Sequence, residues 1–190
     1  MWFAPVILSV AIAGLGEQQS PDVIRQAFLQ RVDEYVTLHR RLEAPLPREV
    51  VTADPAGLFV SREALAAAIR QARADARQGD IFSAAIIPYF RTLVAEALRE
   101  GDIHDMLAIV EEENTVHIPT RVNADYPAGA SIPFMPTCLL AALPTLPPEL
   151  EYRFVGRDLI LWDVHAGLIV DFVPRVIRET TEEFELTGCR

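Results

Sequence analysis

The sequence predicts an α+β fold, in which about four N-terminal helices precede a small C-terminal three-stranded antiparallel meander. Three observations predict it. Apolar residues recur at three- and four-residue spacing in the first half of the chain. Seven prolines fall within residues 114–148, which predicts a Pro-rich segment that wraps the surface. Residues 151–174, EYRFVGRDLILWDVHAGLIVDFVP, are the only stretch with a strong β pattern.

The first 16 residues, MWFAPVILSVAIAGLG, are almost wholly apolar and end in small residues, which predicts a signal peptide cut before Glu17. The run is shorter than the ~20 residues that span a membrane, so we expect no stable span after cleavage. No Arg or Lys precedes it, and a buried N-terminal helix is the alternative. We expect an exported protein, periplasmic or extracellular, in which residues 17–190 form a single domain.

Composition excludes several classes of function. The net charge of −10 repels phosphate backbones, so no nucleic-acid partner is expected. All 17 basic residues are arginine, which excludes a Schiff-base lysine and a Walker A loop. No cofactor-binding motif is present, and no cofactor is expected. In an oxidising compartment, Cys138 and Cys189 either form one bridge or leave a free thiol near the C-terminus.

Two helix starts are visible early in the chain. Ser20 and Pro21 predict a helix over about 21–43, because a hydroxyl cap and a proline in the first turn favour initiation. A second helix is expected from Pro55 to about Arg73. Their apolar residues fall on one face of each helix.

Two further helices and an irregular segment follow. Ser83 is the expected cap of a third helix to about Arg99, and a fourth is expected from Asp102 to about residue 111. Within the Pro-rich segment, one short helix is expected at about 137–142. The acidic tail, residues 174–190, is expected to be loosely held.

The meander is predicted from two turns. Gly156 suits the first central position of a type II′ hairpin turn, because glycine takes positive φ without steric cost. Leu159–Trp162 is apolar on both faces, which is typical of a central strand. Val164–Gly167 forms the second connection, and Pro174 ends the last strand because it has no N–H to donate.

Four segments resemble a family of uncharacterised exported bacterial proteins. They are YVTLHRRL at 35–42, ARQGDIF at 76–82, LPTLPP at 143–148 and the whole of 151–174. The resemblance covers most of the chain after residue 16. It implies export and a shared fold, and it implies no activity.

The clearest chemical pattern is Asp163-x-His165, with Asp158 and Asp171 nearby. Residues two apart in an extended chain share a face, so this pair could hold a metal ion or act on one reacting group. Alternatively, Asp163 caps the turn and His165 is an exposed loop residue. If Asp163 pairs with Leu168, Asp171 falls on the opposite face unless a β-bulge intervenes.

Arginine and histidine also cluster at the end of the first helix. His39, Arg40 and Arg41 are expected to complement the helix dipole there. Together with Arg77 and Asp80, the two arginines predict an ion-pair network between helices, or alternatively a site for an anionic ligand.

The function that the sequence favours is non-catalytic binding of an envelope protein or a small ligand. The expected surface is the Pro-rich segment with Asn123, Tyr126 and Phe134, beside an exposed sheet edge. A metal-binding or metal-dependent protein that uses Asp163 and His165 is the alternative. A hydrolase without a recognisable motif is a weaker one, since no serine lies in a Gly-x-Ser-x-Gly elbow.

Overall fold

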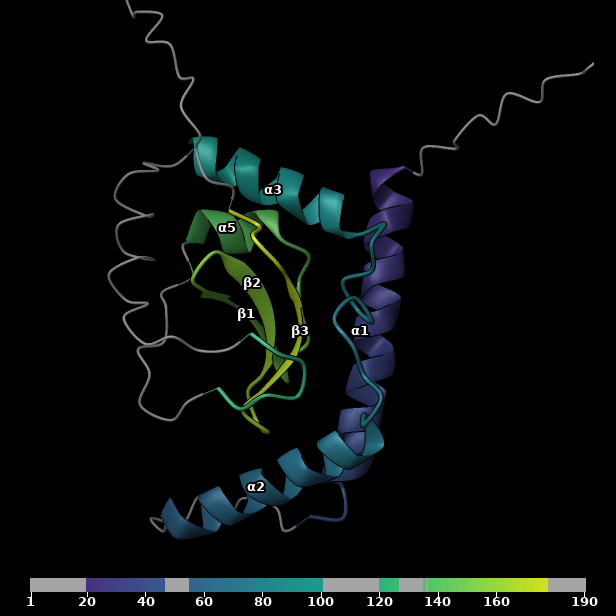
Figure 1. Ribbon diagram of the computed structural model, residues 1–190, viewed down its shortest axis with the longest axis vertical. Coiled ribbons are helices and arrows are strands. Elements are labelled where there is room, and N and C mark those ends of the chain that lie inside the picture. The colour runs from purple at the N-terminus through teal and green to yellow at the C-terminus, as the bar shows by residue number, and fades with distance from the viewer. Residues whose placement is uncertain (1–19, 47–54, 101–119, 127–134, 136, 178–190) are drawn as a thin grey trace, which may run out of the picture.

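The computed structural model in Figure 1 describes residues 20–46, 55–100, 120–126, 135 and 137–177. It confirms the α+β fold, with helices before a three-stranded antiparallel sheet. The predicted signal peptide, the helix expected from Asp102, Phe134, Cys189 and residues 178–190 lie outside the described residues. The helices are α1 (Pro21–Glu43), α2 (Pro55–Ala72), α3 (Ile87–Glu100) and α5 (Thr137–Ala142), and the strands are β1 (Leu150–Val155), β2 (Asp158–Asp163) and β3 (Leu168–Val173).

Helix α1 begins and ends as its sequence predicts. Ser20 Oγ accepts a hydrogen bond from the Val23 N–H, and Pro21 occupies the first turn, where its missing donor costs nothing. Its inward face lies beside the sheet, with α3 crossing near one end of the sheet and α2 near the other (Figure 1). The buried residues of this face are Phe28, Val32, Tyr35, Val36 and His39.

The other helices agree with the prediction except at one start. Helix α2 and the short α5 have the expected bounds, and Cys138 is exposed on α5. Helix α3 begins at Ile87, four residues after the predicted cap, so that start is wrong. The Ser83 carbonyl accepts from the N–H groups of Ile86 and Ile87 in a separate turn, and Pro88 then lies in the first turn of the helix.

The sheet has the order β1-β2-β3, with every pair antiparallel. Gly156 has φ 57°, and Val155 pairs with Asp158 across it, as the predicted hairpin turn requires. Strand β2 is central, and its residues Leu159, Ile160 and Leu161 are fully buried. The prediction of a central strand covered on both faces is therefore confirmed.

A β-bulge changes the face on which the end of β3 lies. Asp163 pairs with Leu168 as expected, but Trp162 pairs with Ile169 and Leu161 with Asp171, which leaves Val170 as the extra residue. Asp171 therefore shares a face with Asp163, and the expectation of opposite faces is wrong. Because the bulge removes a ladder partner, the Val170 carbonyl accepts from the guanidinium of Arg73 instead, at 3.2 Å.

Residues of the Pro-rich segment cover the outer edge of β3. The Asn123 N–H donates to the Ile169 carbonyl at 2.8 Å, and the Tyr126 N–H donates to the Gly167 carbonyl at 2.8 Å. The Ile169 N–H in turn donates to the Ala124 carbonyl. This part of the sheet edge is therefore paired within the chain, and Tyr126 packs into a small second core with Val155, Ile160 and Ile169.

Candidate functional site

Asp163, the last residue of β2, organises the loop that follows it. Its Oδ1 accepts from the N–H of His165 at 3.0 Å and from that of Ala166 at 2.8 Å. The Gly167 N–H donates to the Asp163 carbonyl at 2.8 Å, and Gly167 closes the loop with φ 69°. The expected turn-capping role of Asp163 is confirmed by these contacts.

The second carboxylate oxygen of Asp163 binds helix α1. Asp163 Oδ2 accepts from the Tyr35 hydroxyl and from His39 Nδ1, each at 2.6 Å. Tyr35 and His39 are four residues apart, so both side chains leave the same face of the helix. With four donors on its two oxygens, Asp163 is fully hydrogen-bonded within the protein, and the hypothesis that it is itself a metal ligand is not supported by this geometry.

Burial and hydrogen bonding set the charges in this cluster. Burial raises the pKa of Asp163, but the hydrogen bond and charge of His39 outweigh it and hold that pKa below its usual value. Burial lowers the pKa of His39, but Asp163 and then Glu43 and Glu149 raise it, so the net pKa lies above the ordinary value. Burial and the charge of Asp163 raise the pKa of Tyr35 far above its usual range, so its hydroxyl remains a donor.

These contacts fix the orientation of the His39 ring. A carboxylate only accepts hydrogen bonds, so Nδ1 carries the proton that binds Asp163. The opposite nitrogen, Nε2, is buried and has no hydrogen-bond partner among the described residues. It lies 3.4 Å from Glu43 Oε2, which is an ion-pair distance if the ring is protonated. In the neutral ring, the lone pair of Nε2 is therefore available to a ligand.

Glu43 and His165 complete the group around Nε2. Glu43 Oε1 lies 2.8 Å from His165 Nδ1, and the rings of His39 and His165 have centroids 5.3 Å apart. Each of the three residues offers one nitrogen or oxygen within 4.8 Å of the others. His39 is fully buried, while the side chains of Glu43 and His165 are 41% and 46% exposed. The cluster is thus anchored in the core and open to solvent on one side.

Two imidazoles and one carboxylate form a common ligand set for zinc and for other divalent transition metals. In such sites, a histidine ligand usually donates its second ring N–H to a carboxylate, which fixes the tautomer. Asp163 makes this contact with His39. The geometry therefore fits a metal centre in which His39, Glu43 and His165 are the ligands and Asp163 positions His39.

The neighbouring Arg40 is paired with a different residue from the one expected. Its Nε donates to Glu149 Oε1 at 2.6 Å, and the Glu149 carboxylate is nearly buried. Burial raises the pKa of Glu149, but Arg40 lowers it to a net value below the usual one. This ion pair is neutral as a whole, so it adds no net charge beside His39, Glu43 and His165.

The other sequence-predicted site residues lie elsewhere. Asn123 has φ 63°, and its side chain donates to the Arg73 carbonyl at 2.9 Å. Tyr126 is buried, with its ring 5.5 Å from that of Trp162. The Arg77 N–H donates to Asp80 Oδ2 at 2.9 Å, within a turn. These contacts give Asn123, Tyr126 and Asp80 structural roles, and Phe134 lies outside the described residues.

Sequence reasoning missed two of the three candidate ligands. His39 was expected to complement the helix dipole, yet it is fully buried. Glu43 did not figure among the candidates at all. The available signal was the four-residue spacing of Tyr35, His39 and Glu43, which places three polar groups on one face of α1.

Comparisons with protein-family models, with curated proteins and with solved structures give no match to this chain. Among the described residues, none of the helices combines the length and the apolar character that crossing a membrane requires.

Proposed function

We propose that this protein binds one divalent transition-metal ion, with zinc as the best fit, through His39, Glu43 and His165. One observation carries the proposal. The buried Nε2 of His39 lacks a hydrogen-bond partner among the described residues, while a carboxylate and a second imidazole lie around it.

Energetics favour an occupant at this nitrogen. Leaving a buried polar atom without a partner costs roughly 1–3 kcal/mol, and coordination to a metal removes that cost. The hydrogen bond from Nδ1 to Asp163 prepares the ring, because it directs the remaining lone pair towards Glu43 and His165. The competing explanation is a structural ion pair between protonated His39 and Glu43, which needs no metal.

The described residues favour metal binding over an envelope-interaction role for the Pro-rich segment, because Asn123 and Tyr126 are engaged inside the protein. They also give little support to a hydrolase, since His39 Nδ1 is held by Asp163 and its Nε2 contacts no hydroxyl or thiol. Export to the periplasm or beyond, and membership of the exported family, stay predictions from the sequence.

The test is a calorimetric zinc titration of the metal-free full chain, with the bound metal counted by mass spectrometry. We expect one zinc ion per chain. His165→Ala and Glu43→Gln should each weaken binding roughly tenfold or more, since even indirect partners of a metal contribute that much.

Glu34→Gln is the matched control, because Glu34 lies exposed on the same helix and, among the described residues, pairs only with Gln30. Zinc binding that is absent in the natural chain, or that is equally strong in all three variants, would leave only the structural ion pair.

A further inference from the structure

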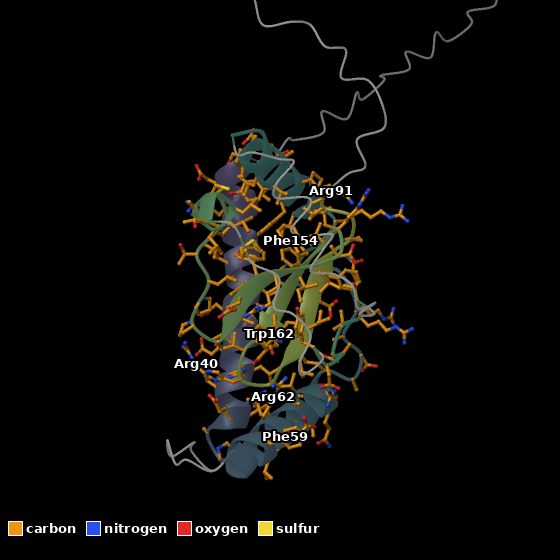
Figure 2. All side chains as sticks on the ribbon, turned by 90° about the vertical axis from the view of Figure 1, so that its left-hand side faces the viewer. Arg40, Phe59, Arg62, Arg91, Phe154 and Trp162 are labelled. Carbon is orange, nitrogen blue, oxygen red and sulfur yellow. The ribbon has the colours of Figure 1, made fainter. Side chains whose placement is uncertain are left out.

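A second charged group, Arg62, lies against the loop that carries His165. Arg62 belongs to α2, and Figure 2 shows it between this helix and the near end of the sheet. The guanidinium of Arg62 occupies the space in which a side chain on Gly167 would lie. The guanidinium therefore packs directly on the backbone of the loop.

Arg62 forms no hydrogen bond or ion pair within the part of the chain that the structure describes, and it is partly buried. A guanidinium has five N–H donors in a planar fork that matches carboxylate and phosphate oxygens. A partly buried guanidinium usually has an acceptor, and Arg62 has none among the described residues. This arrangement favours an acceptor from outside the described part of the chain, such as a bound anion.

The metal centre and Arg62 flank one short loop. His165, a proposed ligand, is two residues from Gly167, and the loop is closed by the hydrogen bond from the Gly167 N–H to the Asp163 carbonyl. The proposed ligand His165 and the glycine that Arg62 contacts therefore belong to the same short loop.

With a divalent ion bound, the charges around the site would sum to one uncompensated positive charge, which favours one negatively charged ligand. Asp163 and Glu43 together balance a divalent ion, and Arg40 is balanced by Glu149. The charge of Arg62 then remains uncompensated. In addition, three protein ligands leave a fourth position of a tetrahedral zinc ion open, on the side where Glu43 and His165 are exposed.

We infer that the metal-loaded protein binds a small oxyanion, a carboxylate or phosphate group, which takes the open position on the metal and is held by Arg62. The inference rests on the proposed metal site and adds the class of its ligand. It makes this protein a receptor for an anionic small molecule that needs both the ion and the arginine.

Cobalt(II) is the probe, because its visible spectrum changes when a ligand enters its coordination shell. The full chain is loaded with cobalt and titrated in separate arms with acetate and with inorganic phosphate. The same titrations are made on Arg62→Gln and on the control Arg25→Gln, an exposed arginine near the start of α1.

We expect a saturable spectral change that Arg62→Gln weakens roughly tenfold, as the loss of a charge-assisted hydrogen bond implies. Cobalt affinity itself should be unchanged in Arg62→Gln, and Arg25→Gln should behave as the natural chain. The arm with the tighter binding identifies the oxyanion.

Two results would overturn the inference, and they differ in whether the proposed metal site survives. Cobalt that binds but responds to neither anion, or responds equally in Arg62→Gln, removes the anion site and leaves the metal site standing. Failure of cobalt to bind removes both proposals together.

Discussion

His39 Nδ1 and Asp163 Oδ2 lie 2.6 Å apart, although 124 residues separate them in the sequence. The contact is fully buried and joins the end of helix α1 to the end of the central strand. It therefore has two roles, since it holds two elements of the fold together and orients the ring that we propose as the anchor of the metal.

Asp163→Asn should affect both stability and metal binding. The amide keeps the shape of the side chain but offers one acceptor to donors that now use two oxygens, so we expect a loss of about 2–4 kcal/mol in the free energy of unfolding. Zinc affinity should fall roughly 10–100-fold. Urea denaturation and zinc titration measure the two effects. Asp75→Asn is the control, because Asp75 is exposed.

Tyr35→Phe removes only the hydroxyl that donates to Asp163. The ring stays in place, and so does its contact with Arg73, whose Cζ lies 5.1 Å from the ring centroid. We expect the free energy of unfolding to fall by about 1–2 kcal/mol, because a buried carboxylate loses one of its donors. An unchanged denaturation midpoint would show that this hydrogen bond contributes nothing net.

Gly167→Ala should cost more than Gly156→Ala. Both glycines have positive φ, at 69° and 57°, but a methyl group on Gly167 would collide with Arg62, whereas one on Gly156 meets nothing within 4 Å. The change at Gly156 should cost about 1 kcal/mol from backbone strain alone.

A double-mutant cycle isolates the collision. In an Arg62→Ala background, the cost of Gly167→Ala should fall to that of Gly156→Ala, as measured by chemical denaturation. Equal costs of Gly167→Ala in both backgrounds would mean that the loop accommodates the methyl group by another route.

Asp171→Ala should be among the most damaging substitutions in the sheet. Its carboxylate is fully buried and accepts from four backbone N–H groups, those of Gly79, Ile81, Phe82 and Phe172. Removing it leaves buried donors unpaired, so we expect a loss of more than about 3 kcal/mol. Asp80→Ala, which removes the acceptor of one exposed N–H, should cost less than about 1 kcal/mol by the same measurement.

Zinc should stabilise the folded chain, because the three proposed ligands come together only in the folded state. At free zinc 100 times the dissociation constant, the free energy of unfolding should rise by about 2.7 kcal/mol. Thermal denaturation with and without zinc tests this, and a tenfold loss of affinity in His165→Ala should reduce the rise to about 1.4 kcal/mol at the same zinc concentration. Zinc that leaves the melting temperature of the natural chain unchanged would contradict binding to the folded state.

The parts of the fold that the sequence predicts are those set by local signals. Ser20 and Pro21 mark the start of α1, and the turns at Gly156 and Gly167 mark the hairpins, because caps and positive φ depend on neighbouring residues alone. The bulge at Val170 escapes such reasoning, since the apolar run of β3 reads the same in either register. The side of the sheet on which Asp171 lies is consequently mispredicted.

The candidate site depends on contacts between distant segments. His39 and Glu43 belong to α1, while Asp163 and His165 belong to the end of β2 and its loop. The sequence shows each group, and the rule that residues two apart share a face correctly draws attention to Asp163 and His165. It does not show which face of α1 meets that loop, because this is decided by packing of the whole core.

The contacts of Arg73 and Asp171 favour the observed register of the sheet over the register without the bulge. The Arg73 guanidinium binds the Val170 carbonyl that the bulge exposes and lies over the Tyr35 ring, while Asp171 receives the turn at residues 79–82. If β3 paired without the bulge, Asp171 would turn away from that turn and Arg73 would lose its carbonyl. In the competing sheet, the amides of Gly79, Ile81 and Phe82 would lose their acceptor and Arg73 would lose one of its acceptors, which disfavours that register.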